Sequence, residues 1–325
     1  MRVSNSVVVI TGASSGIGRA TALRFAAKGA RLVLAARGSE SLEAVAAQCR
    51  KRGAKAIAVP TDVTDPGKVE ALASRAVEEF GRLDVWVNNA AVGAFGLLTE
   101  IPPKEFQRVL DVNITGYVNG ARAALTRQTA QGSGTLINVS SIVAEVPLPY
   151  SAAYSVSKAA VRALSISLRS ELAREGVSGV HVCTVLPATI DTPFYQNAAN
   201  FTGRRPMAMP PVYTPQRVAK AVVKLAARPR RETVAGGFGG RLLVLQHKFT
   251  PGAVEAAAAR QVDHRQLSRW RSTSVTPGNL HQASQSIGKA ATTGGWHGRR
   301  RTAQRMVAGA AALTGAVVAL RKRLG

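Results

Sequence analysis

Short apolar runs rich in β-branched residues alternate with longer segments of helical periodicity through the first 190 residues. This alternation is typical of repeated strand–helix–strand units, which build a parallel sheet. Each run is apolar throughout, which predicts strands covered by helices on both faces. The fold class is therefore α/β with a doubly wound parallel sheet, and the predicted strands are residues 7–10, 31–35, 56–60, 85–88, 135–139 and 180–186.

The region after residue 190 is predicted to complete the sheet and then to change character. A helix near residues 216–227 and a glycine turn at 236–240 precede a seventh predicted strand at 241–246. We therefore expect a main α/β domain at 1–250 and a helical or flexible basic extension at 251–301. Within the extension, residues 270–301 are rich in Ser, Thr, Gly, Gln and basic residues and hold no acidic residue, which indicates a flexible linker.

Composition narrows the class of protein without assigning a function. A chain of 325 residues that is 46% hydrophobic can bury a sizeable core, which excludes global disorder. The formal net charge of +25 makes nucleic acid and an anionic membrane candidate partners, and charge alone does not choose between them. Cys49 and Cys183 are too few for a disulfide framework and lack zinc-site spacing, so we expect a cytoplasmic protein without a metal site. No secretory signal peptide is recognised.

The last 24 residues, 302–325, combine an apolar stretch at 306–320 with arginine and lysine on both sides. As a helix, these fifteen apolar residues would span about 22 Å, which is short for a hydrocarbon core of about 30 Å. Cationic flanks favour association with a membrane surface. The alternatives are an Ala-rich helix packed on another subunit, a partly unfolded tail, and a nucleic-acid-binding tail, which the scarcity of aromatic residues disfavours.

A glycine-rich turn joins the first predicted strand to the helix that follows it. Glycines let the backbone approach a pyrophosphate, and the start of a helix presents unpaired N–H groups to an anion. The order strand, turn, helix is the context in which such a motif is specific for a dinucleotide. The predicted cofactor-binding residues of the turn are Gly12, Ser14, Ser15, Gly16, Ile17 and Gly18.

Arg37 lies at the end of the second predicted strand, where dinucleotide enzymes usually place an acidic residue on the adenosine ribose. An arginine without a neighbouring carboxylate favours the additional phosphate of NADP over NAD. The alternative is a solvated surface arginine, which is common in so basic a chain.

Further motifs occur in a fixed order along the chain. They are Asp62-Val63, Asn88-Asn89-Ala90, Asn113, Ser140-Ser141 and the pair formed by Tyr154 and Lys158. Together with the sequence from Thr11 to Gly18, they resemble the short-chain dehydrogenase/reductase family over residues 5–250. The resemblance implies a Rossmann fold and an oxidoreductase that uses NADP or NAD on an alcohol or carbonyl carbon. It also implies a homodimer or homotetramer.

The resemblance implies a catalytic group of Asn113, Ser141, Tyr154 and Lys158. Carbonyl reduction needs a proton donor at the substrate oxygen, and the pKa of free tyrosine, about 10, is high for that task at neutral pH. Lys158 follows Tyr154 by one helical turn, so its charge can stabilise the phenolate. Ser141 would polarise the substrate oxygen, and Asn113 would anchor a water in a proton relay. Ser140 and Tyr150 are the competing residues, and their spacings fit less well.

Other positions carry over from the family one at a time. Asp62 and Val63 match the adenine-binding pair, Asn89 lies near the adenosine ribose, and Tyr154 and Lys158 also contact the nicotinamide ribose. The segment over the nicotinamide is predicted to include Pro187, Ile190 and Thr192. Ala188 departs from the glycine that commonly follows the proline, which puts the local backbone shape in doubt.

The substrate is expected beneath a lid at residues 194–211, which contains Tyr195, Phe201, Met207 and Met209. Other loops would add apolar side chains, namely Phe95, Val146, Leu148 and Tyr150. This composition favours an apolar ketone, aldehyde or secondary alcohol. The competing class is a non-enzymatic nucleotide-binding or scaffold protein, which has no chemical need for the pair of Tyr154 and Lys158.

Overall fold

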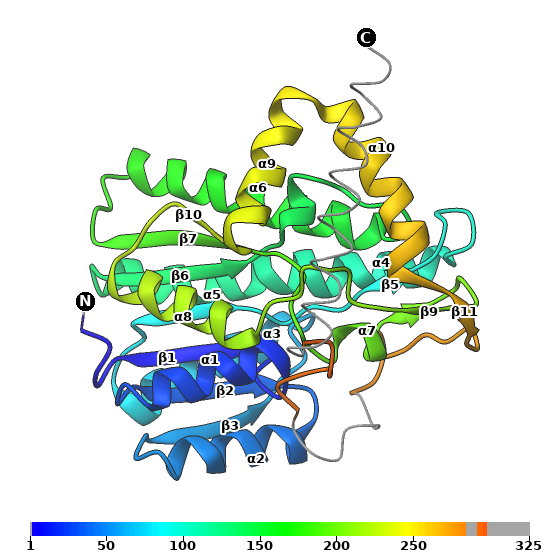
Figure 1. Ribbon diagram of the computed structural model, residues 1–325. Coiled ribbons are helices and arrows are strands. Elements are labelled where there is room, and N and C mark those ends of the chain that lie inside the picture. The colour runs from blue at the N-terminus through cyan, green and yellow to red at the C-terminus, as the bar shows by residue number, and fades with distance from the viewer. Residues whose placement is uncertain (1, 284–290, 298–325) are drawn as a thin grey trace.

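Seven parallel strands form the central sheet of the computed structural model, which describes residues 2–283 and 291–297 (Figure 1). The strand order is β3-β2-β1-β4-β6-β7-β10, and every neighbouring pair is parallel. This confirms the predicted fold class. The strands are β1 Val7–Thr11, β2 Arg31–Ala36, β3 Ala56–Pro60, β4 Val85–Asn88, β6 Gly134–Val139, β7 Val180–Pro187 and β10 Glu232–Ala235.

Helices cover both faces of the sheet and bury its strands. On β1, Val8 and Ile10 pack into one hydrophobic cluster and Val7 and Val9 into the other, because successive side chains of a strand point to opposite faces. One cluster receives α1 Gly16–Ala26, α2 Ser39–Arg50 and α8 Pro215–Ala227. The other receives α3 Pro66–Phe80, α4 Pro103–Leu110, α5 Gly116–Ala130 and α6 Ala152–Arg174.

The strand order reverses at β1, which lies between β2 and β4. Val9 pairs with Val33 of β2 on one side and with Trp86 of β4 on the other. In an open parallel sheet, the connections diverge at such a switch point and leave a crevice at the carboxyl ends of the strands. The functional site is therefore expected beyond Thr11 and Asn88.

The seventh strand lies elsewhere than predicted. Residues 241–246 belong to α9 Gly237–Phe249, and β10 pairs with β7 instead, Glu232 opposite Thr184. An apolar run of four residues, Leu242 to Leu245, fits a strand and a helix equally well. Most of the glycine turn belongs to the start of a thirteen-residue helix, whereas the short β-branched segment before it reaches the edge of the sheet.

The extension beyond α9 folds back onto the main domain. It continues through α10 Pro251–Gln261 and a π-helical turn, Val262–Gln266, into β11 Leu267–Ser272, which pairs antiparallel with β9 Arg204–Pro206. Figure 1 shows α9 and α10 rising beyond the sheet and β11 lying beside β9. Among the described residues after β11, Thr276, Leu280 and Trp296 hydrogen-bond to the main domain, so this part of the predicted flexible linker at 270–301 is held in place.

No helix within residues 2–283 and 291–297 combines the length and apolar character needed to cross a bilayer. The apolar segment predicted at 302–325 lies outside the described residues.

A chain of buried hydrogen bonds joins β4, β6 and the helices behind them. The Trp86 indole donates to Asn88 Oδ1 at 2.7 Å, and Asn88 Nδ2 donates to Asn138 Oδ1 at 3.0 Å. Asn138 Nδ2 in turn donates to Ser165 Oγ at 2.9 Å. Gly120 of α5 packs directly on this chain, and a Cβ there would lie 2.2 Å from Asn88 Oδ1.

We predict that Gly120→Ala lowers the free energy of unfolding by about 3 kcal/mol, because the methyl group displaces a buried hydrogen-bonded amide. Gly252→Ala in α10 is the matched control, since a Cβ there meets no atom within 4 Å. The control should be neutral or stabilising by up to about 1 kcal/mol. Chemical denaturation followed by circular dichroism measures both, and equal stability of the two variants would contradict the packing role of Gly120.

Candidate active site

The glycine turn is fixed to the end of β4 by hydrogen bonds. Asn89 Nδ2 donates to the carbonyl oxygens of Thr11 and Gly12 at 2.9 and 3.2 Å. Gly12 has φ +64°, and a Cβ there would lie 2.7 Å from Ala90 Cα, so this position requires glycine. Gly18 packs against Gly12. A Cβ on Gly18 would lie only 2.2 Å from the carbonyl oxygen of Gly12. The turn therefore presents its backbone at the switch point, where an anion is expected.

The amino end of α1 suits a pyrophosphate. Ser15 is the N-cap residue, and its side chain caps none of the first-turn amides, which leaves them for another acceptor. One of them, Gly16 N–H, donates to the carbonyl oxygen of Ala291 at 3.0 Å, so the C-terminal segment reaches this end of the helix.

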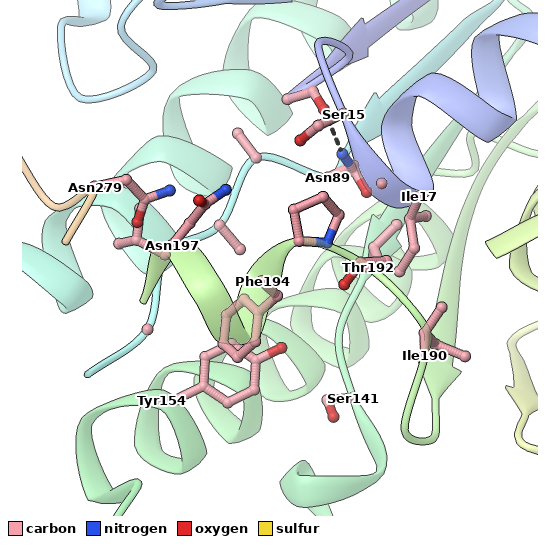
Figure 2. A pocket seen from close by; sticks show the side chains of 18 of the residues that line it. Ser15, Ile17, Asn89, Ser141, Tyr154, Ile190, Thr192, Phe194, Asn197 and Asn279 are labelled. Carbon is pink, nitrogen blue, oxygen red and sulfur yellow. Dashed lines mark hydrogen bonds between the residues drawn. The ribbon is translucent and has the colours of Figure 1, made fainter. Parts of the chain in front are cut away.

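A pocket of about 680 Å³ extends from this turn to the lid (Figure 2). It brings together most of the predicted site residues: Gly12, Ser14, Ser15, Gly16, Ile17, Arg37, Asp62, Val63, Asn89, Ser141, Tyr154, Lys158, Pro187, Ile190 and Thr192. Two predicted residues, Gly18 and Asn113, do not line it.

At one end of the pocket, Asp62 is held by its neighbours. Its Oδ1 accepts from Thr64 N and Oγ1 at 3.0 and 2.8 Å, and its Oδ2 accepts from Arg108 Nη2 at 3.1 Å. Burial, the largest influence, raises the pKa of Asp62, but the bonds from Thr64 and Arg108 outweigh it and leave the pKa below its ordinary value. Asp62 is therefore a carboxylate whose two oxygens already accept hydrogen bonds.

At the other end, Lys158 is anchored by the fold. Its side chain is 1% exposed, and Nζ donates to the carbonyl oxygen of Val139 at 3.0 Å and to Tyr117 Oη at 3.2 Å. Burial without a neighbouring carboxylate lowers the pKa of Lys158 to about 7. The amine therefore changes charge near neutral pH.

Tyr154 lies one helical turn before Lys158, with Nζ 5.5 Å from its ring centroid. Ser141 and Tyr154 share a hydrogen bond that lowers the tyrosine pKa, but burial outweighs it and raises the pKa above its ordinary value. Burial, and not the neighbouring cation, therefore decides the direction of this shift. The phenol is protonated at neutral pH, as a proton donor must be.

The two serines that follow β6 have different partners. Ser140 Oγ donates to the carbonyl oxygen of Lys158 at 2.7 Å, which ties α6 to the end of β6. Ser141 contacts Tyr154 and begins a short 3-10 turn, Ile142–Ala144. Of the two, Ser141 is the serine that contacts Tyr154. The competing Tyr150 does not line the pocket.

Asn113 is fully buried in a π-helical turn, Asp111–Thr115, between α4 and α5. Its Nδ2 donates to Ser157 Oγ and the carbonyl oxygen of Val92, both at 2.9 Å, and its Oδ1 accepts from Val92 N. The side chain thus joins α6 to the loop after β4. Tyr117, which sequence reasoning missed, is the side chain that contacts the Lys158 ammonium.

Aromatic side chains cover Tyr154. Phe194 and Tyr195 begin the lid in α7 Phe194–Asn197, and the Phe194 ring centroid lies 5.1 Å from that of Tyr154. Phe95 of β5 Ala94–Phe95 stacks on Tyr195 at 6.2 Å, and β5 pairs with β8 Ala199–Asn200 of the lid. Val146, Leu148 and Met209 also line the pocket, whereas Phe201 and Met207 pack elsewhere.

The methyl group of Ala188, the departure from the family pattern, faces Gly236. A Cβ on Gly236 would lie 2.6 Å from Ala188 Cβ, so the glycine before α9 makes room for the alanine.

A family model described as "short chain dehydrogenase" matches residues 6–202. The chain belongs to the short-chain dehydrogenase family. It is 33% identical over 322 residues to the uncharacterized oxidoreductase YxnA of Bacillus subtilis, which covers 97% of this chain and 90% of the relative. It is 37% identical over 234 residues to the oxidoreductase Lmo0432 of Listeria monocytogenes, covering 70% of this chain and 93% of that one.

A solved structure shares the fold. The short-chain dehydrogenase/reductase of Burkholderia phymatum, crystallised in complex with NAD, superposes with a TM-score of 0.70 at 27% identity. The match covers 78% of this chain and 96% of that chain. This short-chain dehydrogenase is therefore an oxidoreductase of a nicotinamide-binding family.

The C-terminal segment contributes residues to the pocket that no sequence motif predicted. Asn279 and Ala283 line the pocket. Asp191, 2% exposed at the base of the lid, accepts from the backbone N–H groups of Gly294, Trp296 and His297 at 2.9, 2.8 and 3.1 Å. The extension therefore closes one side of the short-chain dehydrogenase pocket.

The low pKa of Lys158 predicts a pH-dependent stability that Lys158→Met should remove. Above its pKa of about 7 the native lysine has lost its proton, which the unfolded chain keeps up to a pKa of about 10.4. Unfolding then takes up a proton, so the free energy of unfolding of the wild type should rise with pH across this window.

The slope for one proton is at most about 1.4 kcal/mol per pH unit. Denaturant titrations of both proteins between about pH 6 and pH 9 measure the difference. Parallel profiles of wild type and Lys158→Met across this window would contradict a lowered lysine pKa.

Proposed function

We propose that this protein transfers a hydride between NADP(H) and the carbonyl or alcohol carbon of an apolar ketone, aldehyde or secondary alcohol. The observation that carries the proposal is the placement of Tyr154, which is hydrogen-bonded to Ser141 and faces Lys158 within one pocket. The bound dinucleotide supplies or accepts the hydride.

The remaining chemistry belongs to the protein. In reduction, Tyr154 donates its phenolic proton to the substrate oxygen, and Ser141 donates a hydrogen bond to the same oxygen as charge develops there. The phenolate that remains is stabilised by Lys158, whose pKa of about 7 leaves a substantial cationic fraction at neutral pH. Asn113 acts as a positioning residue that fixes α6 through Ser157. Oxidation runs the same proton transfers in reverse.

The preference for NADP rests on Arg37, which lines the pocket at the end of β2. The residue that follows it is Gly38, so the strand end itself carries no acidic residue to hold ribose hydroxyls. Two of its N–H donors go to backbone carbonyls, and a guanidinium carries five, which leaves donors for a phosphate. The Burkholderia relative was crystallised with NAD, and NAD is the second candidate for this chain.

The preference for an apolar substrate rests on the walls around Tyr154. Phe95, Phe194 and Tyr195 form an aromatic surface there, and Leu148 and Met209 extend it. A hydrophobic surface of this kind stabilises an apolar group far more than a polyol.

Two predicted partners follow from the family and the sequence. A homodimer or homotetramer agrees with exposed Val156 and Ile166 on α6, which are 50% and 40% exposed. The cytoplasmic location of the protein stays a prediction, and so does its contact with a membrane surface through residues 302–325.

We predict that Tyr154→Phe lowers kcat about 100- to 10,000-fold, because it removes the proton donor. A panel of apolar ketones, aldehydes and secondary alcohols is first assayed with NADPH, NADH and their oxidised forms to find the best substrate. The variant should bind NADPH with unchanged affinity by fluorescence titration. Full activity of Tyr154→Phe would refute its role, and a wild type that binds the dinucleotide without turnover on any compound would favour the non-enzymatic class.

We predict that Arg37→Ala weakens NADPH binding about 10- to 100-fold, the equivalent of one lost charge-assisted phosphate contact. NADH is the internal control, because it lacks the additional phosphate and should lose about tenfold less affinity than NADPH does. Isothermal titration calorimetry with both reduced cofactors measures the ratio. An equal loss for the two cofactors would assign Arg37 a structural role instead.

A further inference from the structure

Residues 276–283 of the C-terminal segment bring Asn279 and Ala283 to the pocket and are fixed to the lid. Thr276 and Asn200 exchange two backbone hydrogen bonds of 3.0 and 2.8 Å. Asn279 N–H donates to the carbonyl oxygen of Asn197 at 2.8 Å. These bonds use backbone atoms only, so the side chain of Asn279 has no part in holding the segment.

Two guanidinium groups fix the same segment from the sheet side. Arg37 donates from Nη2 to the carbonyl oxygen of Asn279 at 2.5 Å and from Nη1 to that of Leu280 at 3.0 Å. Arg108 Nε donates to the Leu280 carbonyl oxygen at 3.1 Å, and the Leu280 side chain is fully buried. Asn279 is thereby placed beside Arg37 and within reach of the end of the pocket assigned to adenosine.

Asn279 lines the pocket, and its side-chain amide oxygen is the atom that matters for a ligand. Figure 2 shows it extending from the C-terminal segment beside Asn197. Its Oδ1 is buried and accepts no hydrogen bond from the residues that the structure describes. A buried amide oxygen without a donor is costly, which points to a donor that arrives with a ligand.

The donor expected at this end is the exocyclic amine of adenine. The family pattern assigns adenine to Asp62, whose oxygens already accept three hydrogen bonds from Thr64 and Arg108, and Asn279 offers a second acceptor at this end of the pocket. An asparagine amide matches the edge of adenine, since its oxygen accepts from the amine while its NH₂ donates to the neighbouring ring nitrogen.

We propose that Asn279 binds the adenine edge of the dinucleotide, so that the C-terminal segment is a part of the cofactor site. This inference rests on the proposed function, because it requires a nicotinamide adenine dinucleotide in the pocket. Recognition of the base by Asn279 is independent of the catalytic step.

The test compares NADP with its hypoxanthine analogue, in which the adenine amine is replaced by a carbonyl oxygen. Calorimetric dissociation constants are measured for the wild type, Asn279→Leu and Asn279→Ser, without any substrate. We expect the wild type to bind NADP about tenfold more tightly than the analogue, as one hydrogen-bonded base edge implies. In both variants the two ligands should bind with affinities within about twofold of each other.

Gln282→Leu is the matched control, because Gln282 belongs to the same segment but is exposed and does not line the pocket. It should keep the tenfold preference of the wild type, and thermal unfolding verifies that each variant is folded. A preference that persists in Asn279→Leu and Asn279→Ser would overturn the inference and leave the proposed function intact. A wild type that binds neither dinucleotide would overturn the proposed function as well.

Discussion

The buried ammonium group of Lys158 is the constraint on which the arrangement of the site depends. An amine enclosed by protein must find its acceptors inside the fold, since water cannot reach it. The carbonyl group of Val139 at the end of β6 and the hydroxyl group of Tyr117 on α5 supply them. Ser140 then ties the backbone of Lys158 to the same strand end. The sheet, α5 and α6 must therefore meet correctly before Tyr154 faces the pocket.

The sequence could predict the parts of the fold that depend on local pattern. Six strands lie where apolar runs indicated them, because burial on both faces of a parallel strand leaves a continuous apolar signature. The seventh strand was misplaced, since the apolar run from Leu242 to Leu245 carries no information about its partner. The edge strand of the sheet is β10, because Glu232 pairs with Thr184 of β7. These two residues lie nearly fifty positions apart in the sequence.

The residues of the site could be predicted from the sequence, but their surroundings in the packed protein could not. The resemblance to the family predicted Ser141, Tyr154 and Lys158 as neighbours, and the pocket brings them together. It did not reveal that burial would raise the Tyr154 pKa, because burial is a property of the packed lid and not of the motif. The role of the C-terminal segment was also hidden. Its contacts to Arg37 and Gly16 use backbone carbonyl groups, which every residue carries regardless of composition.

The base of the lid depends on residues that are synthesised late, because Asp191 accepts hydrogen bonds from them. Its carboxylate is sealed at the base of the lid and accepts amides that lie about a hundred residues further along the chain. During synthesis the amino-terminal part of a chain emerges and folds first. The sheet and the glycine turn can then assemble while Gly294 and Trp296 are still untranslated. The hydrogen bonds that Asp191 accepts at the base of the lid can form only after these residues have been made.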